Sequence, residues 1–319
     1  MTRKDIAVAL LLAILCAIVA LTSPQFLSGT NLQNVSRLVG TYGIFSIGVG
    51  IVIITGGIDL SAGSICALLG VLLSLMLVDW QWPAAVALAV TLALGACLGG
   101  VHGLLVTRLR LQPFIVTLCG LLLYRGAARY IARDSTKGFG TGAGFEWLRT
   151  LASGHVGGVP MPFVLLGIVT VAAWLLLHRS VFGRHLIAVG RNEEAARYAG
   201  VRTQAVVAWA YVISGTLTAV SATIIAFYTN SISPASHGNF YELYAIAAAV
   251  VGGCSLRGGE GSVVGIVMGA ALLQVLRNLV NLLDIPGSLD FAVMGAVILL
   301  GAVADELVAR RSRRSARFL

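Results

Sequence analysis

Asp59 is the acidic residue that lies deepest among the apolar stretches of this sequence. A charged side chain at membrane depth is costly unless it is paired or hydrated, and such residues often mark proton or cation sites. The alternative is structural, because Asp59, or Ser61 two residues later, could cap the following helix by accepting its free N–H groups. We favour the cap, since no basic or second acidic residue lies in the same apolar runs to form a proton relay.

The residue patterns of intramembrane enzymes are missing from the sequence. There is no His-Glu-x-x-His motif, and neither Ser153 nor Ser214 has the Gly-x-Ser setting of a nucleophile. A phosphate loop of the GxxxxGKS/T type is absent too, and Lys4 and Lys137 are the only lysines. We therefore expect no catalytic residue, no metal and no cofactor in this chain, and any ATP with its Mg would have to be bound by another chain.

Gly183–Arg202 is a charged island with the sequence GRHLIAVGRNEEAARYAGVR. Asn192 can cap a short helix that has Glu193 and Glu194 in its first turn, and Gly200 can end it. A helix of about two turns is marginal in water, so we expect contact with another element to hold it. The residues that could make this contact are the small Ala195, Ala196 and Ala199, with Tyr198 as a candidate aromatic anchor. The alternative is a solvated connector whose charges only fix the topology.

The bulk composition is that of a membrane protein. Of the 319 residues, 58% are hydrophobic and 11% are charged, whereas soluble domains are usually about 25% charged. The formal net charge of +9 raises the question of nucleic acid, but the basic residues lie between apolar runs and in the last ten positions. The positive-inside rule explains them. We expect a lipid bilayer around the protein and no nucleic-acid partner.

Apolar runs of about 20 residues predict an all-α polytopic membrane protein with about ten segments and both termini in the cytoplasm. The segments are Ile6–Leu21, Val35–Thr55, Leu60–Val78, Pro83–Val106, Pro113–Ile131, Met161–Leu177, Ala205–Tyr228, Tyr241–Gly252, Val263–Leu283 and Phe291–Val303. The first is interpreted as a retained span, because no Ala-x-Ala cleavage pattern follows it. Asn34 is the expected cap of the second, and a long outside loop is expected over Ala132–Pro160.

Two glycine-rich breaks interrupt the apolar runs at similar places in the two halves. Tyr241–Gly252 would reach only about 18 Å as a helix, so we expect a re-entrant segment covered by protein or facing an aqueous cavity. Paired broken helices indicate a transport pathway, although chance similarity is the alternative in a glycine-rich chain. The break residues that are candidates for this pathway are Gly56, Gly57, Asp59, Ser61, Gly252, Gly253 and Ser255.

Other polar residues of the apolar runs receive structural interpretations. Four arginines near segment ends are expected to extend their charged ends to the interface, or else to line an outer vestibule: Arg37, Arg125, Arg129 and Arg277. His102 is interpreted as a packing residue, because the glycines beside it suggest close helix approach.

Four ordered stretches carry a family resemblance. Ile53–Ser64 reads IITGGIDLSAGS, Gln112–Leu118 reads QPFIVTL, and Tyr241–Gly253 reads YELYAIAAAVVGG. Together with Gly183–Gly200 they resemble, in the same order, ribose-type sugar permeases of ABC importers, over about residues 31–305. Glu194-Ala195-Ala196 followed by Gly200 is similar to the EAA-x-x-x-G core of ABC-importer permeases. Two departures are Cys254, where small or hydroxyl residues are more familiar, and the missing proline of longer EAA motifs.

The resemblance implies a permease subunit of an ATP-driven monosaccharide importer in the bacterial inner membrane. It implies a single transmembrane permease domain over 1–319, with a cytoplasmic coupling loop at 183–202 and a basic cytoplasmic tail at 304–319. The implied partners are a second permease copy or close paralogue, two ATPase subunits that bind ATP and Mg, and a periplasmic sugar-binding protein. The residues implied to dock the ATPase are Arg191, Asn192, Glu193, Glu194, Ala195, Ala196, Arg197, Tyr198 and Gly200.

Other functions stay open at this point. Related permeases carry nucleosides or branched-chain amino acids, so either is an alternative substrate. An ion-coupled secondary transporter would require titratable groups at the membrane midplane, and Asp59 is the only candidate. A passive channel would leave the capped polar helix without a role.

Overall fold

The computed structural model describes residues 3–140 and 144–286 and the isolated positions 289, 292, 295, 296 and 299. Apart from four of those positions, the predicted last segment Phe291–Val303 lies outside the described residues, as does the predicted tail 304–319. Within the described part, eight helices are long and apolar enough to cross a membrane. They correspond to eight of the predicted segments, which confirms an all-α polytopic membrane fold. The cytoplasmic placement of both termini stays a prediction.

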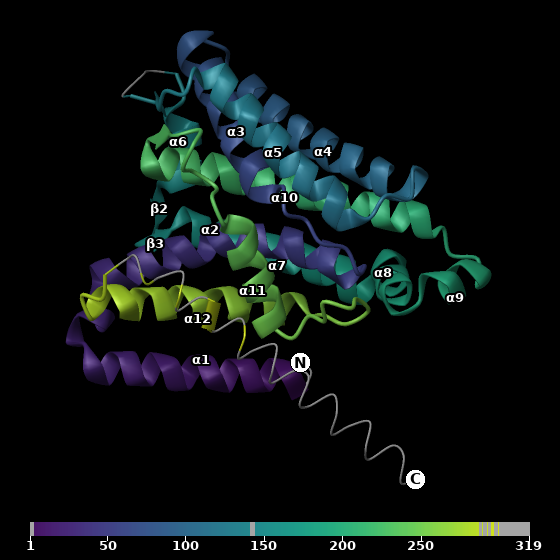
Figure 1. The fold of residues 1–319 in the computed structure, drawn as a ribbon. Coiled ribbons are helices and arrows are strands. Elements are labelled where there is room, and N and C mark those ends of the chain that lie inside the picture. The colour runs from purple at the N-terminus through teal and green to yellow at the C-terminus, as the bar shows by residue number, and fades with distance from the viewer. Residues whose placement is uncertain are drawn as a thin grey trace.

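The spanning helices lie side by side in Figure 1, with α8 and α9 at one end of the bundle and α6 with β2 and β3 at the other. Their bounds are α1 Arg3–Thr22, α2 Gly29–Ile54, α3 Ala62–Ser74, α4 Ala84–Arg108, α5 Pro113–Ala132, α7 Met161–Trp174, α10 Thr203–Thr229 and α12 Val263–Leu282. Single π-helical turns extend α3 over Leu75–Asp79 and α7 over Leu175–Arg179.

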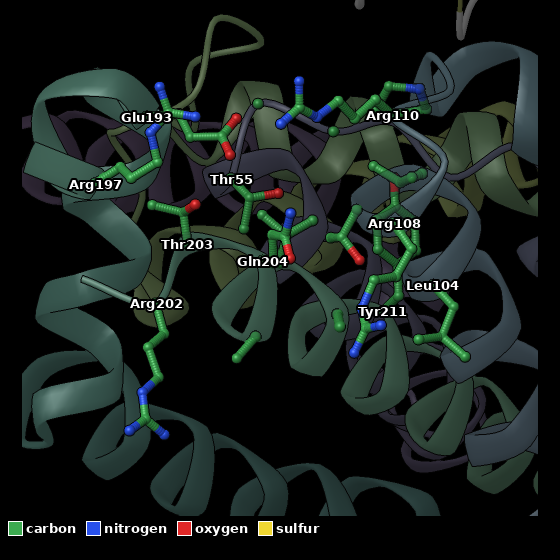
Figure 2. Close-up of a pocket in the computed structure, with 18 of the residues that line it drawn as sticks. Thr55, Leu104, Arg108, Arg110, Glu193, Arg197, Arg202, Thr203, Gln204 and Tyr211 are labelled. Carbon is green, nitrogen blue, oxygen red and sulfur yellow. The ribbon is translucent and has the colours of Figure 1, made fainter. Parts of the chain in front are cut away.

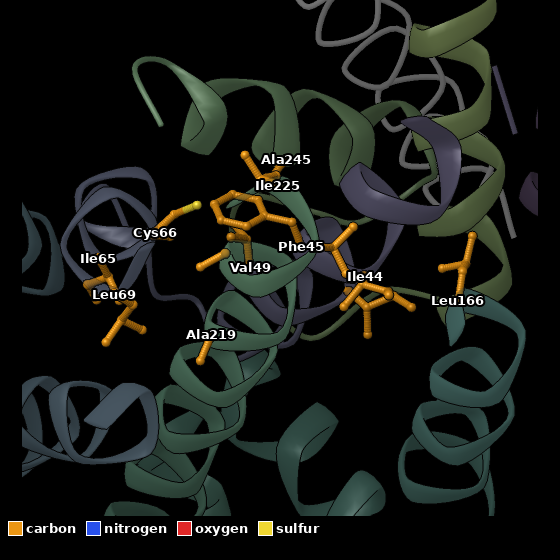
Figure 3. Packing of buried hydrophobic residues seen from close by; sticks show 14 of the residues in the cluster. Ile44, Phe45, Val49, Ile65, Cys66, Leu69, Leu166, Ala219, Ile225 and Ala245 are labelled. Carbon is orange, nitrogen blue, oxygen red and sulfur yellow. The ribbon is translucent and has the colours of Figure 1, made fainter. Parts of the chain in front are cut away.

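α2, α3 and α10 form the centre of the bundle, while α1, α4, α5 and α7 lie outside them. In the most apolar 18-residue stretch of α2, 89% of the residues are buried, compared with 17% in the corresponding stretch of α1. In Figure 3, Phe45 and Val49 of α2 pack between Cys66 of α3 and Ile225 of α10. We infer that the outer helices expose their apolar side chains to lipid, whereas the inner helices bury theirs in the core of the bundle.

Small residues bring α4 and α10 into backbone contact. A Cβ atom on Gly99 would overlap the carbonyl oxygen of Tyr211, and one on Gly103 would lie 2.7 Å from the Cα atom of Ala208. Close approach through small residues is the usual way in which membrane helices gain packing energy. The close helix approach predicted around His102 is therefore confirmed.

The start of α2 differs from the prediction. Ser28, and not Asn34, is its cap, since the Ser28 hydroxyl accepts the N–H of Asn31 at 3.3 Å. The polar first turns continue as helix because their side chains find partners: the Asn31 and Asn278 amides exchange hydrogen bonds of 2.8 and 3.1 Å. A polar residue such as Asn34 therefore does not by itself show where a helix begins.

The loop 132–160, which the sequence predicts to lie outside, carries more structure than expected. Helix α6 covers Glu146–Ser153 and buries Leu148 and Ala152. Strand β1 (Lys137–Gly138) pairs with β4 (Ser231–Ile232), and β2 (His155–Val156) pairs with β3 (Val159–Pro160), both antiparallel. The short 3-10 turn η1 (Pro24–Leu27) joins α1 to α2.

Candidate functional site

Helix α9 (Glu193–Tyr198) is the capped polar helix that the sequence predicts. The Asn192 side-chain oxygen accepts the N–H of Ala195 at 2.9 Å, and Gly200 adopts a φ of +84°, which ends the helix. Tyr198 is 80% exposed and Ala196 is buried against the chain. The helix therefore rests on a small residue and leaves its large aromatic side chain open to another molecule.

Helix α8 (Val181–Arg191) carries α9 and was not predicted as a helix. The Ser180 hydroxyl caps it by accepting the N–H of Gly183 at 3.1 Å. Its buried residues Gly183, Leu186 and Val189 repeat every three positions, which is the available sequence signal for a helix lying on the bundle. The single residue Asn192 separates α8 from α9, so α9 is attached directly to the end of α8.

Four glycines join α8 to both membrane breaks, and we call Gly56, Gly190, Gly258 and Gly259 the glycine junction. A Cβ atom on Gly190 would overlap the Ile54 carbonyl oxygen and the Gly259 nitrogen, and one on Gly258 would lie 2.7 Å from the Gly56 nitrogen. The Gly259 N–H donates to the Ile54 carbonyl at 2.8 Å. The end of α2, the second break and the helix that carries α9 are therefore in mutual backbone contact.

The first break, residues 55–61, holds a buried carboxylate. Asp59 Oδ1 accepts the N–H of Ser61 at 3.0 Å and its hydroxyl at 2.6 Å, and Oδ2 lies 3.4 Å from the Ser214 hydroxyl. Ser61 stands at the cap position of α3, but its side chain accepts no helix N–H. The predicted cap by Ser61 is thus wrong, because the Ser61 hydroxyl donates to Asp59 instead. Asp59 accepts the N–H of Ser61, the residue just before α3, as the alternative in the prediction expected of a carboxylate at this helix start.

His102 extends this cluster and is more than a packing residue. Its Nδ1 lies 3.3 Å from the Ser61 hydroxyl and its Nε2 lies 2.9 Å from the Tyr124 hydroxyl. Since Ser61 donates to Asp59, a neutral imidazole must donate from Nδ1 and accept the Tyr124 proton at Nε2. The result is a buried chain from Tyr124 through His102 and Ser61 to Asp59, which the sequence analysis missed because the partners come from α3, α4 and α5.

Arg125 holds the connection between α10 and α11 (Tyr241–Val251) inside the bundle. Its guanidinium donates to the carbonyl oxygens of Pro234 at 2.9 Å and His237 at 2.6 Å. A Cβ atom on Gly63, at the start of α3, would overlap the carbonyl oxygen of Gly238 in the same connection. The half-buried Arg125 thus binds protein carbonyl groups, and its place at the interface or at an outer vestibule stays a prediction.

The predicted short apolar segment is confirmed as a helix of 11 residues.

Replacing Arg125 with alanine is expected to lower the melting temperature of the purified protein by about 2–6 °C, because two partly buried carbonyl groups lose their donor. Arg129, one turn later on α5, is the matched control, since it forms an exposed ion pair with Asp134 at 2.6 Å. Alanine at Arg129 should leave the melting temperature nearly unchanged. Equal effects of the two substitutions in a thermal unfolding assay would contradict the proposed role of Arg125 in holding the connection between α10 and α11.

The second break, residues 252–262, is fixed by α1 and α12. A Cβ atom on Gly252 would overlap the Gly265 carbonyl oxygen, and Gly253 has a φ of +91° beside the Lys4 side chain. Lys4 Nζ donates to Glu260 Oε2 at 2.9 Å and holds the pKa of that carboxyl below its usual range. Ser255 accepts the N–H of Arg257 at 3.2 Å. These contacts hold the second break as an ordered loop next to α8.

One cavity of about 1030 Å³ opens beside α9, the start of α10, the turn between α4 and α5, and the first break. Gly56 and Gly57 line it, whereas Gly252, Gly253 and Ser255 do not. Figure 2 shows Arg108, Arg110, Arg197 and Arg202 around the cavity, with Thr55 and Gln204 between them. Tyr211 lies at its inner end, where its buried hydroxyl has no hydrogen-bond partner within the described residues. Of the predicted pathway residues, the structure therefore places only Gly56 and Gly57 on the cavity, whereas Asp59 and Ser61 are buried away from it and the second break does not reach it.

Comparison with known proteins identifies the kind of chain that carries this arrangement. A family described as the branched-chain amino acid transport system / permease component matches residues 31–302. The chain belongs to this family. This permease is 38% identical to the ribose import permease protein RbsC of Escherichia coli K12 over 294 residues, which cover 92% of this chain and 91% of the relative.

Two other relatives agree with this assignment. The ribose import permease protein RbsC of Haemophilus influenzae is 36% identical, with 92% of this chain and 90% of the relative covered. The xylose transport system permease protein XylH of Escherichia coli K12 is 32% identical, with 96% and 92% covered. No solved structure matches the permease. It is a multi-pass membrane protein, and among its described residues no group of three or more His, Cys, Asp or Glu side chains is placed to hold a metal ion.

Proposed function

We propose that this permease is the membrane-spanning subunit of an ATP-driven importer that passes a monosaccharide into the cytoplasm across a bacterial inner membrane. The relatives named for ribose and xylose support a pentose or a similar sugar. The family description keeps a branched-chain amino acid as the alternative substrate, and a nucleoside is a further one. A periplasmic binding protein would supply the sugar, and a second copy or close paralogue would complete the membrane part.

The observation that carries this proposal is the helix α9, which is capped, exposed and joined through α8 to both breaks. Glu194, Ala195 and Ala196 with Gly200 form the motif that resembles the ATPase-docking core. Two ATPase subunits, which would bind all the ATP and Mg, would meet this helix from the cytoplasm. Closure of those subunits would displace α9, and the glycine junction would pass the displacement to the end of α2 and to the second break.

Glu194→Arg is expected to reduce co-purification of the ATPase with the permease by at least about tenfold, because a charge reversal in a contact surface adds repulsion. Glu194 lies 3.8 Å from Arg197 in an exposed pair, so the substitution should not alter membrane insertion. Glu146→Arg on α6, at the opposite end of the bundle, is the control and should keep the ATPase bound. Normal ATPase recovery and normal sugar uptake with Glu194→Arg would contradict the docking role.

The buried chain from Tyr124 to Asp59 is the observation that favours a second candidate, an ion-coupled transporter. A carboxylate and an imidazole joined through a serine could relay a proton. The same contacts also tie the break to α4, α5 and α10, and Thr117 adds a hydrogen bond of 3.1 Å to the Ile58 carbonyl. We therefore assign this chain a positioning role, which a substitution at Asp59 tests directly.

A further inference from the structure

The cavity beside α9 carries an excess of positive charge. Four arginines and two glutamates line it, which gives a formal charge of +2: Arg108, Arg110, Arg197, Arg202, Glu193 and Glu194. Arg197 is close to Glu194. Within the described residues, the other three arginines have no ion pair. They come from the end of α4, the turn after it and the residue before α10, so residues far apart in sequence bring positive charge to different sides of one cavity.

Apolar side chains lie directly beside these charges. Leu104 precedes Arg108 by one turn of α4 and is 53% exposed, and Leu111 follows Arg110 and is 44% exposed. Both leucines line the same cavity. A cavity for a free anion would need only the polar groups. Guanidinium groups next to exposed leucines at a helix end instead match a ligand with an anionic head and an apolar tail.

We infer that Arg108 and Arg110 bind the phosphate of an anionic phospholipid from the cytoplasmic leaflet, with Arg202 adding positive charge from the other side of the cavity and the acyl chains along Leu104 and Leu111. Phosphate suits arginine because the planar guanidinium offers paired N–H donors to its oxygens. The ligand chemistry is a phosphate ester, which a soluble sugar phosphate shares, but the exposed leucines favour the lipid. The inference goes beyond the proposed function and uses only its orientation, which sets the leaflet.

A lipid bound in this cavity would also affect how ATPase docking at α9 is coupled to the membrane helices. The cavity is bounded by α9 on one side and by the first break on the other. A headgroup held by the α4–α5 turn and attracted by Arg202 would brace the start of α10 against α4 while leaving the exposed Tyr198 face of α9 open. Anionic lipid would then stabilise the arrangement to which an ATPase docks.

The test is the lipid that the full-length permease retains when it is purified alone from bacterial membranes in mild detergent. Native mass spectrometry should detect bound phosphatidylglycerol on the wild-type chain. The Arg108→Gln/Arg110→Gln variant should retain it at least about tenfold more weakly, since each arginine near an anionic surface contributes on the order of a several-fold gain. Arg202→Gln should show a smaller loss. Arg179→Gln/Arg184→Gln removes two arginines from the neighbourhood of α8 outside the cavity and should retain the lipid as the wild type does.

A second arm distinguishes the sources of phosphate. Vesicles of phosphatidylcholine with added phosphatidylglycerol should restore the lipid to delipidated wild-type permease, whereas excess glycerol 3-phosphate should neither bind nor compete. Equal retention by the wild type and the double variant, or binding of glycerol 3-phosphate without lipid, would overturn the inference. Because the ATPase is absent from these measurements, a failure here is separate from a failure of the docking role at Glu194.

Discussion

Replacement of Gly190 by alanine is expected to reduce ATP-driven sugar uptake by about tenfold or more while the ATPase still binds the permease. The added methyl group would overlap the carbonyl oxygen of Ile54 and the nitrogen of Gly259, and neither backbone atom can rotate away. Overpacking of this kind costs about 1–3 kcal/mol, and every 1.4 kcal/mol is a factor of ten. The end of α8 must then separate from the breaks, so movement of α9 would no longer reach them.

The measurement is uptake in vesicles alongside ATPase recovery and ATP hydrolysis in the same preparation. Gly126→Ala on α5 is the matched control, because a Cβ atom there meets nothing within 4 Å. It should leave uptake and hydrolysis unchanged. Loss of ATPase binding with Gly190→Ala would indicate that α9 itself is distorted, and unchanged uptake would exclude the glycine junction as the mechanical link.

Asp59→Ala is expected to abolish uptake, whereas Asp59→Asn should retain it within about threefold. Alanine removes the acceptor for three donors, from Ser61 and Ser214, and leaves buried hydroxyls unpaired, at a cost of about 3 kcal/mol. Asparagine keeps an acceptor for Ser61 and places its amide group towards Ser214, whose hydroxyl can accept. A positioning role therefore tolerates asparagine.

Uptake at several pH values, with thermal unfolding of the purified variants, separates the two functions. A proton-coupled transporter would lose uptake with asparagine as completely as with alanine, because the amide cannot carry the proton. The Thr216→Val variant is a suitable control. The Thr216 hydroxyl donates to the Val212 carbonyl of its own helix at 2.8 Å and takes no part in the Asp59 cluster.

Much of the fold follows from the sequence because the bilayer restricts the choices. Eight apolar runs became the eight spanning helices, and the short run at Tyr241 became a short helix, since only helices satisfy the backbone in lipid. The cap at Asn192 and the stop at Gly200 were also predictable, because both are local backbone requirements. Local signals failed at Asn34, where a long-range pair between Asn31 and Asn278 extends the helix.

The candidate site was less predictable because it depends on which helices are neighbours. His102 lies 41 residues from Ser61, and Arg125 lies 112 residues from the carbonyl group that it holds. No spacing rule within one segment brings such residues together. The two breaks could be recognised from their glycines, but their contact with α8 could not, since it is made by backbone atoms that every sequence shares.

The glycine junction has a mechanical consequence. Contacts between side chains contain slack, because a rotamer change or a small tilt absorbs a displacement of a few tenths of an ångström. Backbone atoms pressed against backbone atoms have no such freedom, and the hydrogen bond from Gly259 to Ile54 fixes their separation at 2.8 Å. We therefore expect Gly190 to pass even a small displacement of α9 to the end of α2 and to the second break, because these contacts leave little room for adjustment.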